Sequence, residues 1–453
     1  MIGTVREWLA RGVLLPLYRA QRALRPSRRA ALRHCTEGRR FRSDAVGWSD
    51  ARKRDWMLAQ LRVAVRRAYR ETSFYRAHLD AAGFDPAADF HFADFARLPV
   101  LDREALQSAG PGLRSRAMAS ADLRRDATGG STGTPTEIWM GPEELGWRES
   151  GMIHFMERIG LPSGARTAFL WGHHLDPVAS DGFKERMYSF IENVRWFECL
   201  RLSPAQLRLD HRELERWRPR CLIAYASALG ALAEVVREER QRPRYPTHCF
   251  VTGAEKLMPR HRELIEQVYG RPVHERYGSR DVGLMAFQVV AAGDADFEVD
   301  WANVFIEPET PGDNSPILVT KLHADGMPML RYRVGDVAHF PSDSRPGHPA
   351  LRLREILGRE ADRVWLADGG WVDGITFPHM FKDQPVREFQ VVQRRDLSVE
   401  LRLVPARGFT PESQHQILQT VRANLPGLEV RLALMEDIPR TRASKLRPVV
   451  SER

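Results

Sequence analysis

The sequence has little of what marks a secreted, metal-binding or membrane-spanning protein. Its only close histidine pair, His173-His174, has no third ligand at a suitable spacing, so we expect no metal site there. The longest apolar run near the start, Val13 to Leu17, is far shorter than the roughly 20 residues of a spanning helix, and no secretion signal is evident. The four cysteines form no Cys-x-x-Cys pair and are expected to be reduced packing residues of a cytoplasmic protein: Cys35, Cys199, Cys221 and Cys249.

Internal repeats, low-complexity tracts and long Gly/Ser linkers are absent as well, and the composition is that of a folded globular chain. The 453 residues are 43% hydrophobic and 28% charged, which is enough apolar material for a large core. A chain of this length exceeds the size at which a single hydrophobic core usually stops growing. We therefore predict two domains, a large one over residues 1–358 and a small one over residues 359–453.

The charge of the chain is unevenly distributed. The formal net charge is +9, which suits a partner that carries phosphates, such as a nucleotide, a membrane surface or nucleic acid. Most of the excess positive charge lies in residues 1–34, which hold eight arginines and one glutamate. These residues belong to a basic helical segment that is predicted over residues 1–100. These first residues would either lie as an amphipathic helix on an anionic membrane or pack against the core. We expect no nucleic-acid partner, and a peripheral membrane contact through residues 1–34 stays open.

Short apolar segments alternate with amphipathic ones between residues 165 and 278. Strands are predicted at 167–171, 221–225, 248–252 and 273–277, and helices at 207–217, 229–239 and 259–269. Because these strands lack an alternation of polar and apolar residues, we predict an α/β fold with a parallel sheet that is covered by helices on both faces. Ligands bind such sheets at the carboxyl ends of the strands, which directs attention to the residues after Thr252 and Tyr277.

The remainder of the chain has a different order of elements. Strands are predicted at 389–392, 399–404 and 430–434, with a helix at 413–423 between the last two. This order is typical of a compact α+β unit. The two domains would meet near residues 357–362.

Residues 128–136 form a loop that is suited to binding phosphate. They comprise three glycines, four threonines, one serine and one proline, so that backbone amides and hydroxyls are exposed together. The Walker pattern and the dinucleotide-binding glycine pattern both fail here, and no lysine occurs in the loop. Taken alone, the loop would also suit a flexible hydroxyl-rich hairpin.

The loop resembles the phosphate loop of the adenylate-forming superfamily, and later segments resemble its phenylacetate:CoA ligase-like branch. These segments follow in the family's order: Val251-Thr-Gly-Ala-Glu255, Glu275-Arg-Tyr-Gly-Ser-Arg-Asp281, Leu330-Arg-Tyr-Arg-Val-Gly-Asp336, Leu357-Gly-Arg-Glu-Ala-Asp362 and Ile438-Pro-Arg-Thr-Arg-Ala-Ser-Lys445. The resemblance covers the chain from about residue 128 to about residue 450. It implies a large multi-layer N-terminal domain and a small, mobile α+β C-terminal domain.

The resemblance also implies a site for ATP and magnesium. It assigns Asp281 to magnesium and catalysis, Lys445 to catalysis, and the following residues to the nucleotide: Thr128, Gly130, Ser131, Thr132, Gly133, Thr134, Gly253, Ala254, Glu255, Tyr277, Gly278, Ser279, Asp336 and Arg359. Within this set, Tyr277 would pack on adenine and Asp336 would bind the ribose hydroxyls. For the acid substrate, the predicted strand ends offer Trp171, Tyr225 and Ser227, each of which would equally suit the core.

The reaction implied is the ATP-dependent, AMP-forming activation of a carboxylic acid as an acyl adenylate, followed by transfer to coenzyme A or another thiol. The acid attacks the α-phosphorus of ATP, so the charges of two anions must be neutralised while the attack stays in line. Lys445, magnesium at Asp281 and the hydroxyl-rich loop would together meet that need.

Four positions depart from the family's pattern. Asp281 replaces a glutamate, Thr136 replaces the lysine of many relatives, and Ser444 replaces a glycine. At the predicted hinge, Ala361 replaces the first acidic residue, which bears on the transfer step more than on adenylation. Two alternatives therefore stay open: an adenylate-forming enzyme that passes the acyl group to an amine, a hydroxyl or a carrier protein, and a non-catalytic relative that binds a membrane or nucleic acid.

Overall fold

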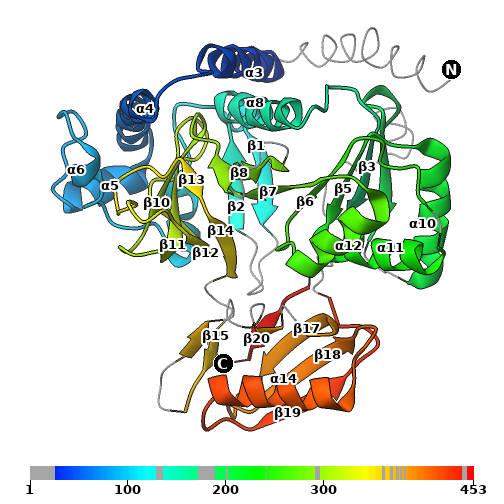
Figure 1. Cartoon of the computed structure of the whole chain (residues 1–453). Helices are drawn as coiled ribbons and strands as arrows, with labels where there is room; N and C mark the ends of the chain where they lie inside the picture. The colour runs from blue at the N-terminus through cyan, green and yellow to red at the C-terminus, as the bar shows by residue number, and fades with distance from the viewer. Residues whose placement is uncertain are drawn as a thin grey trace.

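The computed structural model describes residues 26–128, 136–171, 189–199, 203–240, 242–290, 296–359, 363–367, 371–373, 377, 380–381, 384–440 and 446–452. Figure 1 shows two lobes, one above the other. The large lobe comprises the described residues up to Arg359, and the small lobe comprises those from Arg363 onward.

An eight-stranded mixed sheet runs through the large lobe in the order β13-β9-β8-β7-β6-β5-β3-β4. The five strands from β4 to β7 are parallel, as predicted, whereas β8, β9 and β13 add an antiparallel part. The connection from β7 to β8 is only residues 280–282, which is too short for the crossover that a parallel neighbour requires. The bounds are β3 (Thr167–Trp171), β4 (Val194–Glu198), β5 (Cys221–Tyr225), β6 (Cys249–Gly253), β7 (Val273–Ser279), β8 (Gly283–Gln288), β9 (Phe297–Val299) and β13 (Arg352–Leu353).

Helices cover both faces of this sheet, which confirms the predicted α/β architecture. The helices α10 (Pro204–Trp217), α11 (Ala226–Glu238) and α12 (Pro259–Tyr269) pack on one face, and α8 (Pro142–Arg158) packs on the other. All five residues of β5 and of β6 are buried, because successive side chains alternate between two covered faces.

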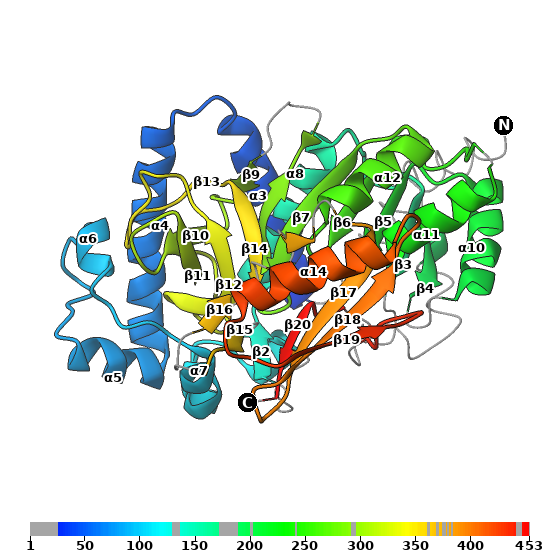
Figure 2. The same cartoon turned by 60° about the horizontal axis from the view of Figure 1, so that its bottom comes forward.

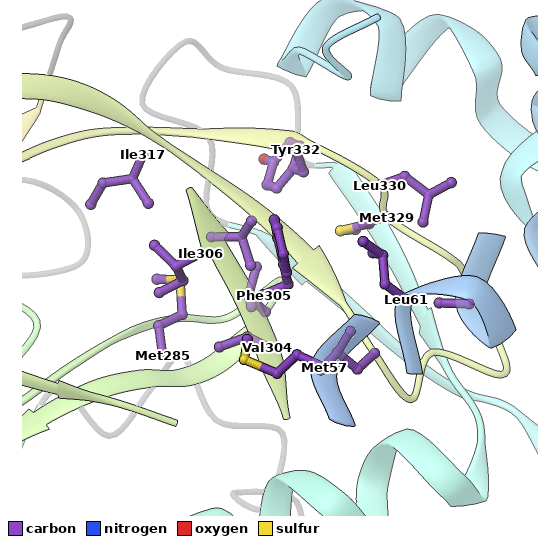
Figure 3. Close-up of a cluster of buried hydrophobic side chains, with 14 of the residues drawn as sticks. Met57, Leu61, Met285, Val304, Phe305, Ile306, Ile317, Met329, Leu330 and Tyr332 are labelled. Atoms are coloured by element: carbon purple, nitrogen blue, oxygen red, sulfur yellow. The ribbon is translucent and has the colours of Figure 1, made fainter. Parts of the chain in front are cut away.

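A second, four-stranded antiparallel sheet completes the large lobe. Its order is β10-β11-β12-β14, with bounds Val304–Pro308, Asn314–Lys321, Tyr332–His339 and Glu355–Arg359. Figure 3 shows its inner side chains, among them Phe305 and Tyr332, in one cluster with Met57 and Leu61 of α4 (Asp50–Glu71) and Met285 of β8. The two sheets therefore share a core, which fixes β7 and β12 beside each other.

Short elements connect this core to the N-terminal part of the chain. They are α5 (Ser73–Ala81), α6 (Phe92–Phe95), α7 (Arg103–Ala109), the 3-10 turns Gly110–Leu113 and Ser120–Asp122, and the hairpin of β1 (Arg124–Thr128) and β2 (Thr136–Met140). The helical segment predicted over residues 1–100 thus includes α4 and α5.

The basic N-terminal segment contributes α3 (Pro26–Asp44), which packs along α8. Gly146 of α8 permits this approach, since a Cβ there would lie 2.5 Å from the carbonyl oxygen of Ala31. Arg42 then forms a buried ion pair with Asp300 at 2.5 Å. Residues 26–34 thus lie in a helix that packs on α8 of the large lobe, whereas residues 1–25 lie outside the described residues. Among the described helices, none combines the length and the hydropathy needed to cross a bilayer.

The small lobe is a four-stranded sheet in the order β19-β18-β17-β20, packed with α14 around its own core. The bounds are β17 (Val386–Gln393), β18 (Val399–Pro405), α14 (Pro411–Asn424), β19 (Val430–Leu434) and β20 (Val449–Ser451), with a small hairpin of β15 (Arg363–Trp365) and β16 (Trp371–Asp373) beside them. The predicted order strand, strand, helix, strand is present, and β20 extends it. The division between residues 358 and 359 stays a prediction.

All four cysteines are free and buried, as the sequence indicated. Cys221 on β5 and Cys249 on β6 are directly opposite each other in the parallel register.

Candidate active site

Those predicted site residues that end or follow β5, β6 and β7 lie where the large lobe meets the small lobe. Figure 2 brings the lower end of the molecule forward and shows the small lobe lying across this end of the large lobe. We call this contact the seam. It includes Met258, which directly precedes α12 and packs against the core of the small lobe.

Tyr277 and Asp336 join the two sheets at the centre of the site. The phenol of Tyr277, on β7, donates a hydrogen bond of 2.8 Å to Oδ2 of Asp336, on β12. Burial raises the pKa of Tyr277 well above its ordinary value, and the carboxylate of Asp336 raises it further. The phenol therefore keeps its proton at neutral pH and acts as a hydrogen-bond donor. Arg359 stands opposite Asp336 in the register of β12 and β14, with Nε 3.7 Å from Oδ1.

A second phenol and carboxylate pair lies beside the first. Tyr332 begins β12 and donates a hydrogen bond of 2.9 Å to Oδ2 of Asp281, which follows β7. Burial raises the pKa of Tyr332, and Asp281 raises it further, so this phenol also stays protonated. In the turn, the backbone N–H of Val282 donates to Oγ of Ser279 at 3.2 Å. The turn and this hydrogen bond together position the Asp281 carboxylate beside Tyr332.

Two glycines permit close approaches at these strand ends. A Cβ on Gly278 would lie 2.3 Å from the carbonyl oxygen of Gly283, so the β7–β8 hairpin requires glycine at residue 278. A Cβ on Gly253 would lie 3.0 Å from Cγ of Arg276, whose side chain passes over the end of β6. Ala254 follows with a φ of 67°, a left-handed conformation that a residue with a Cβ seldom adopts. This segment, which is predicted to contact the nucleotide, thus has a sharply turned backbone.

Glu255 connects the two lobes through a single carboxylate. Its Oε2 accepts a hydrogen bond of 3.0 Å from the backbone N–H of Ser227, in the first turn of α11. A carboxylate is favourable there, because the first amides of a helix have no partner within the helix. Its Oε1 accepts one of 3.0 Å from the backbone N–H of Leu446, in the small lobe. Leu446 follows the predicted catalytic Lys445 directly in the chain, and Lys445 itself lies outside the described residues.

The strand ends predicted to line the acid pocket form an aromatic cluster. The rings of Trp171, on β3, and Tyr225, on β5, are 4.3 Å apart between centroids, and the guanidinium of Arg276 lies 5.1 Å from the Trp171 ring. Tyr225 and Ser227 are almost fully buried, at 3% and 5% exposure, so only small parts of them would face a ligand. Sequence reasoning did not select Arg276, although it directly precedes Tyr277 in a segment that carried the resemblance.

The hydroxyl-rich loop falls almost wholly outside the described residues, together with Gly130, Ser131, Thr132, Gly133 and Thr134. Its described flanks, Thr128 and Thr136, are paired in the antiparallel register of β1 and β2. The hinge residues Ala361 and Asp362 and the pair His173-His174 also lie outside the described residues. Within the described part of the chain, no group of three or more His, Cys, Asp and Glu residues could hold a metal ion.

No family model matches the sequence, but several known proteins are similar to it. The chain is 20% identical to protein CapK of Staphylococcus aureus over 276 residues, which are 60% of this chain and 61% of CapK. It therefore spans less than two thirds of that relative. It is 23% identical to the phenylacetate-coenzyme A ligase of Thermus thermophilus over 337 residues, which are 67% of this chain and 70% of that enzyme.

Among solved structures, 2-hydroxyisobutyryl-CoA ligase with 2-HIB-AMP in the postadenylation state matches with a TM-score of 0.69 at 20% identity, over 89% of this chain and 90% of that one. The chain is thus distantly similar to phenylacetate-coenzyme A ligases, and it has the fold of this adenylate-forming ligase. The predicted fold and the family resemblance are both confirmed. The chain matches the same ligase less well in its open conformation and its thioesterification state, with TM-scores of 0.56 and 0.55. Its two lobes are therefore arranged more as in the postadenylation structure.

Proposed function

We propose that the protein activates a carboxylic acid with ATP, forming an acyl adenylate and pyrophosphate, and then transfers the acyl group to a thiol such as coenzyme A with release of AMP. The observation that carries this proposal is the hydrogen bond from Leu446 to Glu255. It joins the C-terminal segment, which holds Lys445, to the strand ends where the proposed nucleotide residues converge. The likeness to phenylacetate-coenzyme A ligases and to a ligase with a bound acyl adenylate supports the same chemistry.

The nucleotide would lie along the ends of β6 and β7. Tyr277 would pack on adenine beside Gly253 and Ala254, and Asp336, oriented by the Tyr277 phenol, would accept hydrogen bonds from the ribose hydroxyls. Arg359 would face the ribose or the α-phosphate. The acid oxygen attacks the α-phosphorus, and the bond from that phosphorus to the oxygen bridging toward the β-phosphate breaks, so pyrophosphate leaves with the electron pair. Lys445 would neutralise the charge between the two reactants.

Magnesium fits the donors of this site. Mg²⁺ is usually held by one or two carboxylates together with substrate phosphates and water. Asp281 offers one such carboxylate, and its hydrogen bond from Tyr332 leaves the other oxygen, Oδ1, for a metal or its water. When bound, the ion would neutralise charge on the phosphates.

The acceptor is the less constrained part of the proposal. Ala361, in the hinge segment, is the observation that favours a second candidate, in which an amine, a hydroxyl or a carrier protein takes the acyl group instead of coenzyme A. Mass spectrometry of the products distinguishes the two candidates. Acyl-CoA formed at the rate of adenylation would exclude the second one.

The first half-reaction is tested by acid-dependent exchange between ATP and pyrophosphate across aryl, fatty and hydroxy acids. We expect exchange with at least one class and its loss in Lys445→Ala. Lys53→Ala is a matched control, because the ammonium of Lys53 pairs with Asp50 on α4, away from the site. Exchange with no acid, and an unchanged background in Lys445→Ala, would leave the non-catalytic alternative. In that case, binding to vesicles and DNA that disappears when residues 1–34 are deleted would identify these basic residues as the functional part.

A further inference from the structure

The short helix α7 lies between two parts of the site. Just before it, Leu101 is attached to β12: its backbone N–H donates to the carbonyl of Arg331 at 3.1 Å, and its carbonyl accepts from Arg333 at 3.0 Å. One turn into α7, Nε2 of Gln107 donates to Oγ1 of Thr136, the first residue of β2, at 3.0 Å. α7 is thus fixed between β12, which carries Tyr332 and Asp336, and the strand that follows the predicted phosphate loop.

Arg103, the first residue of α7, has a guanidinium that is only partly satisfied. Its Nε and Nη2 are buried, and neither has a hydrogen-bond partner among the described residues. Buried donors are nearly always paired, so two unpaired donors on one half-buried guanidinium are retained chiefly where something else completes them. The charge acts at the site, since it opposes the effect of burial and of Asp281 on the pKa of Tyr332.

We propose that Arg103 binds the β- and γ-phosphates of ATP and holds the pyrophosphate as it leaves; this rests on the function proposed above. A guanidinium presents parallel donors that match two oxygens of a phosphate group and stays protonated throughout. Arg103 lies on the β12 and β2 side of the site, away from the aromatic strand ends of β3 and β5, so it faces the phosphate end of the nucleotide and not the acid. Arg103 would also supply the positive charge that the chain lacks at residue 136, where Thr136 replaces the lysine of many relatives.

Arg103→Met is the informative variant. Because the guanidinium has unpaired buried donors, an apolar side chain of similar length should leave the melting temperature unchanged or raise it. We expect the dissociation constants of ATP and of inorganic pyrophosphate to rise about 10- to 100-fold, while that of AMP changes by less than about twofold. Arg103→Lys should fall between the wild type and Arg103→Met.

Arg114→Ala is the matched control. The Arg114 guanidinium lies over the ring of Trp139, which is on the opposite face of β2 from Thr136, so removing it deletes the same charge without touching α7. All three ligands should bind this variant as they bind the wild type. Equal loss of ATP and AMP affinity together with a lower melting temperature in Arg103→Met would overturn the proposal, because that pattern marks a structural arginine.

The same titrations separate this proposal from the function it rests on. Binding of ATP and AMP with no selective loss in Arg103→Met would overturn the role of Arg103 and leave adenylation standing. Binding of pyrophosphate alone, lost in Arg103→Met, would support the anion site and overturn adenylation. A wild-type protein that binds none of the three ligands would overturn both.

Discussion

The backbone N–H of Leu446 donates to one oxygen of Glu255, while the other oxygen accepts from the N–H of Ser227, both at 3.0 Å. One carboxylate therefore caps α11 in the large lobe and secures the small lobe across the seam. Its two functions are separable by experiment, because the cap affects folding and the seam affects the reaction.

Glu255→Ala should lower the free energy of unfolding by about 1 kcal/mol, the usual effect of losing a helix cap. Because Leu446 would lose its partner, exchange between ATP and pyrophosphate should fall by about tenfold or more. Glu255→Gln, which keeps an acceptor oxygen, should recover part of the free energy of unfolding and part of the exchange rate. Urea unfolding and exchange kinetics provide the two measurements, and full exchange activity in Glu255→Ala would show that the seam contact is dispensable.

Tyr277→Phe removes the hydrogen bond to Asp336 but keeps the ring. Asp336 would lose the donor that orients it toward the ribose, so we expect KM for ATP to rise about tenfold, with kcat less affected. Tyr277→Ala should raise KM further, because the stacking surface is lost too. Steady-state kinetics at saturating magnesium distinguishes the effects, and equal KM values for Tyr277→Phe and the wild type would contradict a role for the phenol.

Tyr332→Phe provides the complementary test on Asp281. Loss of this phenol should raise the magnesium concentration needed for half-maximal activity several-fold, because it positions the carboxylate proposed to hold the ion. At saturating magnesium, KM for ATP should change less than in Tyr277→Phe. If Tyr332→Phe and Tyr277→Phe both changed KM for ATP and left the magnesium dependence unchanged, Asp281 would not hold magnesium.

The burial of His261 at the seam predicts that the protein loses stability in acid. Burial lowers the pKa of His261, on α12, to about 4, and the charge of Arg260 lowers it further, while a hydrogen bond with the backbone of Arg387 in the small lobe opposes the shift. A histidine whose folded pKa lies below its unfolded value of about 6.5 contributes stability above that pH and loses it as the pH falls toward 4. The loss between pH 7 and pH 4.5 should be on the order of 2 kcal/mol.

His261→Gln should flatten this part of the stability profile. The comparison is the difference in unfolding free energy between pH 7 and pH 4.5, not the value at either pH, because the variant also alters packing against Gly230. Burial lowers the pKa of His154 to about 4 as well, so some dependence should remain. A profile as steep as that of the wild type would place the acid sensitivity elsewhere.

The sequence was informative where a pattern is local. The apolar runs of β3, β5, β6 and β7 predicted the sheet, and the ordered motifs predicted that Tyr277, Asp281 and Asp336 would converge. Helix starts were predicted less well: α10 begins at Pro204, after a Ser203 cap, and α11 begins at Ala226, whereas apolar spacing predicted 207 and 229. The cap of α11 comes from Glu255, which no local pattern reveals.

What was missed depends on contacts between distant segments. Tyr332 lies in one of the recognised motifs, but its hydrogen-bond partner Asp281 lies in the β7–β8 turn of the other sheet. Arg103 lies outside every motif, and the attachment of Leu101 to β12 together with the hydrogen bond from Gln107 to Thr136 brings it to the site. β4 was not predicted, because Arg195 and Glu198 interrupt its apolar pattern at the edge of the sheet.

The facing cysteines of β5 and β6 provide an internal probe of motion. Cys221 is fully buried, and burial raises the pKa of its thiol well above the ordinary value, so it is protonated and shielded in the closed sheet. A small alkylating reagent can reach it only when the central strands separate. The rate of labelling under native conditions therefore measures how often the sheet opens, without any introduced cysteine.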